Sequence, residues 1–139
     1  MRYAVISKSL KPDQLESEIK KAGGSDIVKT KLLGHVFCEM DETQAGVAID
    51  LSGRPYLVFE SPVDKELLLV TSDFPFALVE EFWKSTAFRG KFNLHVDVIR
   101  ARNGHHAAEA VFKSAARALR EAMAITGSEV LSTKGTLTA

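Results

Sequence analysis

The chain has 139 residues, of which 45% are hydrophobic and 26% charged, a composition typical of a soluble globular protein of one domain or two small merged units. Basic and acidic residues each number 18, so no net charge favours nucleic acid or a membrane surface. No stretch approaches the roughly 18 apolar residues of a membrane span, and the single cysteine, Cys38, excludes an internal disulfide. We therefore expect a cytoplasmic protein with no nucleic-acid or membrane partner.

The N-terminal part has the pattern of a strand, a helix and further strands. Residues 3–7 are apolar and β-branched, which predicts a strand. Residues 12–22 begin with proline, keep their apolar positions on one face and end at two glycines, which predicts a helix. Residues 26–40 alternate around Gly34 and predict a bent strand or a hairpin.

The middle of the chain predicts more sheet and then a helix. Residues 45–60 contain two alternating apolar runs joined by Ser52-Gly53, the pattern of a hairpin. Residues 61–73 fit a loop with an extra strand. Residues 74–88 have helical spacing of apolar side chains, and we expect Trp83 and the phenylalanines around it to be core.

The last third predicts a strand, the longest helix and a polar tail. Residues 91–101 alternate as a half-buried strand, and residues 103–125 have helical periodicity. The predicted buried stripe of this helix is Ala108, Phe112, Ala115, Leu119 and Met123. Together the elements predict an α+β fold with two layers.

The stretch "NGHHAAEAVFK" at residues 103–113 is the strongest chemical signal. Glu109 follows His105 by four residues and His106 by three, so the three side chains project from one end of one helix face. Imidazole and carboxylate are ligands for manganese, iron and zinc. The alternative is a polar first turn capped by Asn103, with no metal. One helix cannot complete a metal site, so further ligands must come from elsewhere.

Four stretches in chain order resemble the C-terminal half of imidazoleglycerol-phosphate dehydratase. They are "MDETQAGVAIDLSGRPYLVFE", "LVEEFWKSTA", "FNLHVDVIRARNGHHAAEAVFKSAARALREA" and "VLSTKGTL", collinear over about residues 40–137. The resemblance implies a half-domain of the ribosomal protein S5 domain 2-like kind: a two-layer sandwich of a mixed or antiparallel four-stranded sheet with two helices on one face. It also implies homo-oligomers whose active sites lie between subunits and hold manganese ions.

The resemblance assigns metal-binding roles position by position. His105, His106 and Glu109 match the second HHxxE metal motif of the family, and Glu81 in "VEEF" matches a further position of the metal shell. Glu109 is then also the candidate catalytic residue, because a metal-bound carboxylate can handle protons.

The resemblance also assigns a phosphate site. Arg54 in "LSGRPY", and Ser132 and Lys134 in "STKG", match family residues that hold the substrate phosphate. Guanidinium, hydroxyl and ammonium groups are suitable phosphate partners. The implied reaction removes water from a phosphorylated imidazole substrate in histidine biosynthesis, with Mn²⁺ as Lewis acid.

The chain departs from the family in having only one HHxxE motif and none of the first-half residues used on substrate. We interpret residues 1–39 as a foreign βαβ segment and residues 40–139 as the dehydratase-like half-domain, merged into a single domain over 1–139. A natural fusion, a degenerate relative and a laboratory chimera all fit. Gly104, where the family usually has alanine, predicts a looser helix start.

Three functional classes follow. The first is a fragment or chimera that acts as a folded scaffold without a complete active site. The second is a metal-binding but catalytically silent domain, and the third is a Mn-dependent dehydratase-type lyase whose site is completed by homo-oligomerisation. We expect the scaffold.

Overall fold

The computed structural model describes residues 2–4 and 26–127 of the chain. In order, the elements are β1 (Arg2–Ala4), β2 (Asp26–Thr30), β3 (Leu33–Met40), β4 (Thr43–Asp50), β5 (Tyr56–Glu60), β6 (Leu69–Thr71), β7 (Phe74–Pro75), α2 (Ala77–Gly90), β8 (Asn93–Arg100), α3 (Gly104–Ala122) and β9 (Ile125–Gly127). No helix among these residues is long and apolar enough to cross a membrane.

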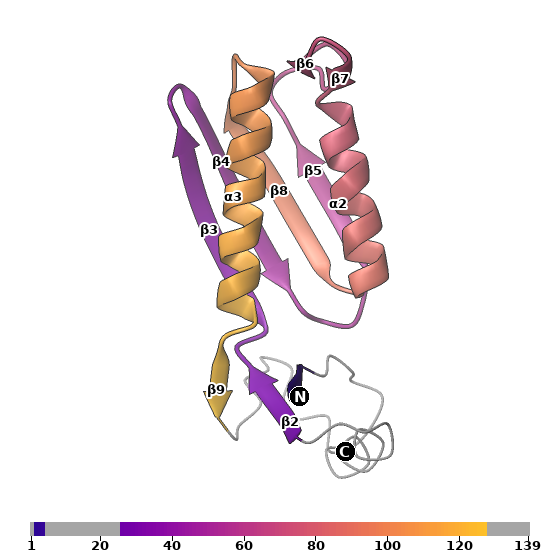
Figure 1. Ribbon diagram of the computed structural model, residues 1–139, viewed down its shortest axis with the longest axis vertical. Coiled ribbons are helices and arrows are strands. Elements are labelled where there is room, and N and C mark those ends of the chain that lie inside the picture. Colours follow the sequence, from indigo (N-terminus) through magenta and orange to yellow (C-terminus); the bar gives the residue numbers. More distant parts are fainter. Residues whose placement is uncertain (1, 5–25, 128–139) are drawn as a thin grey trace.

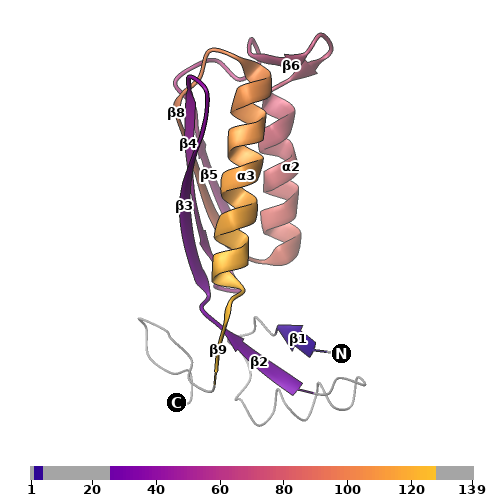
Figure 2. The same cartoon turned by 60° about the vertical axis from the view of Figure 1, so that its left-hand side comes forward.

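The main body is a four-stranded sheet with both helices on one face (Figures 1 and 2). The strand order is β3-β4-β8-β5; β4 is antiparallel to β3 and β8, whereas β5 runs parallel to β8. Helix α3 covers β3 and β4, and α2 lies against β5. This arrangement confirms the predicted two-layer α+β fold with a mixed sheet.

The predicted hairpin over residues 45–60 is wrong. β4 and β5 are both strands, but β8 lies between them, so they do not pair with each other. The tight turn that does join two neighbouring strands is at Asp41 and Glu42, between β3 and β4, where Asp41 has a φ of 50°. Ser52-Gly53 instead opens a longer loop, in which Gly53 takes a φ of 74°.

The segment 26–40 forms two strands that belong to different sheets. β2 lies in a three-stranded sheet of order β1-β2-β9, parallel to β1 and antiparallel to β9. The break falls at Leu32, which has a φ of 67°, and not at Gly34, which lies inside β3. β1 agrees with the predicted first strand as far as Ala4. The helix predicted over 12–22 and the tail over 128–139 lie outside the described residues.

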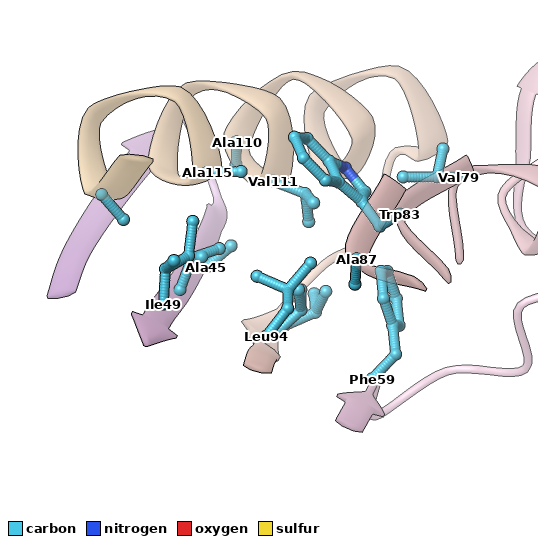
Figure 3. Packing of buried hydrophobic residues seen from close by; sticks show 14 of the residues in the cluster. Ala45, Ile49, Phe59, Val79, Trp83, Ala87, Leu94, Ala110, Val111 and Ala115 are labelled. Carbon is cyan, nitrogen blue, oxygen red and sulfur yellow. The ribbon is translucent and has the colours of Figure 1, made fainter. Parts of the chain in front are cut away.

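The core lies between the sheet and the helices (Figure 3). Val47 and Ile49 of β4 and Leu94 and Val96 of β8 point inward in strict alternation. The side of α3 that faces them is mostly alanine, which lets the helix approach the sheet closely. The approach is close at Gly34, where a Cβ would lie 1.8 Å from the carbonyl oxygen of Ala118.

The predicted buried stripe of α3 is only partly correct. Ala108 and Ala115 are buried, but Phe112 is 39% exposed and Met123 is 47% exposed. Likewise Trp83 of α2 is buried, whereas the neighbouring Phe82 is 50% exposed. The sheet takes up the small side chains of α3, so the large ones lie on the outer side of the helix layer.

Candidate functional site

The histidine pair lies in the first turn of α3, and the structure accounts for how that turn forms. The side chain of Asn103 accepts a hydrogen bond of 3.0 Å from the backbone N–H of His106, the N-cap predicted from the sequence. Gly104 is buried, and a Cβ there would lie 1.9 Å from the carbonyl oxygen of Leu69 in β6. Glycine therefore permits close packing at this point, where the sequence had suggested looseness.

His105 and Glu109 form a solvent-accessible pair on α3, in which Glu109 is half-buried. Nε2 of His105 lies 3.4 Å from Oε2 of Glu109, and the histidine side chain is 64% exposed. The ammonium of Lys113 binds Glu109 at 2.7 Å, one further turn along. That hydrogen bond is the main cause of the lowered pKa of Glu109, so the carboxylate is ionised and able to accept a cation.

His106 turns away from this pair, toward the β3–β4 turn. Its Nδ1 lies 2.9 Å from Oε2 of Glu42, and its Nε2 lies 3.6 Å from Oδ2 of Asp41. The hydrogen bond from His106 lowers the pKa of Glu42 to about 2. The sequence analysis did not identify either carboxylate. Both lie in the β3–β4 turn, whereas the sequence pattern had predicted a hairpin at residues 45–60.

The histidine and carboxylate side chains near the start of α3 are suitable ligands for a divalent metal, but they form two separate groups. The two imidazoles point to different carboxylates, with ring centroids 6.2 Å apart. Among the described residues, no three histidine, cysteine, aspartate or glutamate side chains converge as a metal site. Glu81 is exposed on α2 and belongs to no such group. His105 and Glu109 fit a metal as one open pair of ligands, which other groups would have to complete.

Arg54 lies in the loop between β4 and β5, and its backbone is held by a buried serine. The hydroxyl of Ser52 accepts from the N–H of Arg54 and donates to its carbonyl oxygen, both at 3.2 Å. The arginine side chain is exposed. Ser132 and Lys134, the other two predicted phosphate-binding residues, lie outside the described residues.

The arginine and the histidines lie at opposite ends of the sheet. Asp50, just before the arginine loop, pairs with Asn93 at the start of β8, and Gln44 pairs with Arg100 at its end, just before α3. Seven residue steps along β8 correspond to about 23 Å at roughly 3.3 Å per residue. Figure 1 shows the two ends: the β4–β5 loop lies at one, and the start of α3 lies at the other.

Comparison with known proteins identifies sequence relatives of this chain. The family model of imidazoleglycerol-phosphate dehydratase matches residues 15–119, beginning well before the boundary at residue 40 that the motifs suggested. The enzyme of that name from Chloroherpeton thalassium is 46% identical over 104 residues, covering 75% of this chain and 52% of the relative. The one from Clostridium botulinum is 46% identical over 127 residues, covering 88% of this chain and 62% of the relative.

Solved structures of the same enzyme share the fold. The crystal structure from Staphylococcus aureus superposes with a TM-score of 0.65 at 36% identity, over 78% of this chain and 61% of the other. The structure from Pyrococcus furiosus gives a TM-score of 0.68 at 30% identity, over 78% and 58%. The chain thus spans little more than half the length of the relatives that it matches.

Proposed function

Because the chain belongs to the imidazoleglycerol-phosphate dehydratase family, we propose that it is a folded half-domain scaffold of this dehydratase lineage and that one copy lacks a complete active site. It carries half of a metal site on α3 and part of a phosphate site in the β4–β5 loop. The family match from residue 15 means that the proposal does not need a foreign origin for residues 15–39.

The separation of Arg54 from the histidine motif carries this proposal. In imidazoleglycerol phosphate only a glycerol unit separates the imidazole ring from the phosphate. A span of about 23 Å along β8 is too long for one such molecule to reach both groups in one copy. An arginine and a metal that act on the same substrate must therefore come from different chains.

A dehydration assay on the monomeric protein tests this proposal. We expect no dehydration of imidazoleglycerol phosphate above background by a preparation shown to be monomeric, with Mn²⁺ added. Arg54→Ala should then make no difference to the rate. Turnover by the monomer that is lost in Arg54→Ala would overturn the proposal, because one copy would then bring phosphate and metal groups together.

A lyase completed between copies is the second candidate, and the open His105–Glu109 pair favours it. Both side chains lie on the surface with their ligand atoms 3.4 Å apart, so a second chain can approach them. Bound Mn²⁺ would supply Lewis-acid chemistry toward the substrate imidazole. The chain's own residues would hold the metal through His105 and Glu109, and Asn103 would fix the helix turn that presents them.

Manganese binding followed by electron paramagnetic resonance separates the two candidates. The completed-site candidate predicts stoichiometric binding that is lost in His105→Ala/His106→Ala. It should persist in the control His35→Ala/His95→Ala, which removes two exposed histidines of the sheet. Absence of binding, or equal binding by both double variants, would leave the motif as a helix start on a scaffold. Circular dichroism would verify that each variant is folded.

A further inference from the structure

His105 and His106 are neighbours in the chain, but they contact carboxylates through different ring nitrogens. His105 approaches Glu109 with Nε2, at 3.4 Å, and its side chain is 64% exposed. His106 contacts Glu42 with Nδ1, at 2.9 Å, and only 24% of its side chain is exposed. The difference has a chemical consequence, because the hydrogen bond made by one ring nitrogen decides whether the other nitrogen carries a proton.

The carboxylate of Glu42 is itself fixed in place. Its Oε1 accepts a hydrogen bond of 3.1 Å from the hydroxyl of Thr43, which is buried at the start of β4, and its Oε2 lies against His106. Glu42 belongs to the tight β3–β4 turn, in which Asp41 has a positive φ and Met40 pairs with Thr43. Both carboxylate oxygens are therefore engaged by groups that the fold positions.

The backbone of His106 is fixed as well, by the start of α3. The side chain of Asn103 accepts a hydrogen bond of 3.0 Å from the N–H of His106. The same turn packs closely on β6 at Gly104, where a Cβ would lie 1.9 Å from the carbonyl oxygen of Leu69. The imidazole ring is therefore held at two points, its backbone by the helix cap and its Nδ1 by Glu42.

The charge of Glu42 determines which nitrogen of His106 carries the proton. A carboxylate is ionised at neutral pH and can only accept a hydrogen bond. Nδ1 of His106 must then be the donor, so the neutral imidazole has its proton on Nδ1 and a lone pair on Nε2. The carboxylate of Asp41 lies 3.6 Å from Nε2, which is too far for a hydrogen bond, and its side chain is 75% exposed. Nε2 thus keeps its lone pair available to a ligand.

We propose that Glu42 is a positioning residue for the metal site: its hydrogen bond to Nδ1 holds His106 in the tautomer that leaves Nε2 free to bind a divalent metal. The inference rests on the proposed function, because it takes His106 as a ligand of the half of a metal site on α3. It adds a residue to which the family motifs gave no role. Ligating histidines commonly donate their other ring N–H to a carboxylate, which orients the ring and makes it a stronger ligand.

A contact that only ties the β3–β4 turn to α3 is the alternative, and two features favour the positioning role. A structural tie could use either ring nitrogen, whereas contact through Nδ1 is the one that directs Nε2 away from Glu42. The exposed carboxylate of Asp41 also lies on the Nε2 side of the ring. Negative charge at that side attracts a cation toward the unprotonated nitrogen.

Long-range proton–nitrogen NMR of the metal-free chain tests the assignment without any metal. At about pH 8.5 an ordinary imidazole is neutral, and the nitrogen shifts of its ring report which atom is protonated. We expect the Nδ1–H tautomer for His106, and in Glu42→Ala a return to the Nε2–H tautomer that predominates in free histidine. Glu39→Ala removes an exposed carboxylate of β3 and is the matched control, in which the signals of His106 should be unchanged.

Two results of this measurement would overturn the proposal. One is a wild-type His106 with its proton on Nε2, and the other is a ring with protons on both nitrogens at this pH, because neither leaves Nε2 bare. The wild-type spectrum needs no substitution, so it decides the question even if Glu42→Ala does not fold.

Titration with Zn²⁺, a diamagnetic metal that accepts imidazole ligands, connects the tautomer to metal binding. The Nε2 signal of His106 should shift on binding, and Glu42→Ala should weaken the affinity about tenfold or more, whereas Glu39→Ala should bind as wild type. A shift of Nδ1 in place of Nε2, or equal affinities of the two variants, would overturn the role of Glu42. The expected tautomer with no zinc shift at either His105 or His106 would overturn the metal-binding function on which that role rests.

Discussion

Glu42 shows how one side chain connects the β3–β4 turn to the start of α3. His106 lies 2.9 Å from its carboxylate and lowers its pKa from the ordinary value of 4.5 to about 2. A carboxylate with a depressed pKa stabilises the folded state above its unfolded pKa. That contribution is lost as the pH falls through the folded pKa.

Glu42→Gln should therefore lower the melting temperature by a nearly constant amount between about pH 4.5 and about pH 6, where the carboxylate is ionised. The difference from wild type should shrink as the pH falls from about 4.5 to about 2, because wild type then loses the same interaction. Thermal melts across this range measure it. In a His106→Gln background the same substitution should have a much weaker pH dependence, because only the hydrogen bonds from Thr43 and from the backbone still lower the pKa of Glu42. A difference that stays constant down to pH 2, or that persists undiminished in the His106→Gln background, would contradict the assignment.

At the level of elements, two glycines contrast the face of the sheet that the helices cover with its open face. At Gly34 of β3 a Cβ would meet the backbone of α3, 1.8 Å from the oxygen of Ala118. At Gly46 of β4 a Cβ would meet only the ring of Phe37, at 2.4 Å, on the open face of the sheet. Phe37 is 49% exposed and can rotate, whereas a helix backbone cannot.

We expect Gly34→Ala to destabilise the protein by about 1–3 kcal/mol, the usual effect of overpacking. Gly46→Ala should cost less than about 1 kcal/mol, because a strand alanine recovers part of the loss through lower backbone entropy. Urea denaturation of both variants measures the difference. Equal losses would mean that α3 moves away from β3 as easily as a surface ring rotates.

Local patterns were enough to predict α2, α3 and β8, and they failed where strands distant in the sequence determine the pairing. The alternation of Leu94, Val96 and Val98 specified β8 correctly, and the HHxxE spacing specified the His105–Glu109 pair. The β4–β5 hairpin failed because β8, which lies between them, is more than thirty residues further along the chain. The contact between His106 and Glu42 was missed for the same reason, since it joins elements 64 residues apart.

The burial of α3 illustrates a different limit of prediction from the sequence. Helical periodicity identified an apolar stripe but could not say which part faces the sheet. The sheet takes the alanines, because they allow the approach at Gly34, and leaves Phe112 and Met123 on the outside. Composition alone would place the largest apolar side chains inside, and in this chain the outer side of the helices carries them.

At the scale of the whole molecule, the structure places the boundary between the N-terminal segment and the main sheet earlier in the chain than the sequence motifs suggested. β3 is an edge strand of the main sheet and packs under α3, although the sequence analysis assigned most of it to the N-terminal segment. The break at Leu32 separates it from β2, which pairs with β1 and β9. The backbone N–H groups of Lys31 and Leu32 donate to the carbonyl oxygens of Ala124 and Ala122, at 2.9 and 2.8 Å, so the connection between β2 and β3 is hydrogen-bonded to the end of α3 and to the residues that lead into β9.

Two truncations test whether the cooperative unit starts at β3. A chain without residues 1–30 retains the four-stranded sheet and both helices, so we expect one sharp urea transition. A chain without residues 1–38 loses most of β3 and uncovers the side of α3 around Ala118, so we expect a broad transition or none. Circular dichroism and tryptophan fluorescence of Trp83 should give coincident curves for the first and not the second. If the shorter deletion also abolishes cooperativity, the chain is a single merged domain that needs its N-terminal segment to fold.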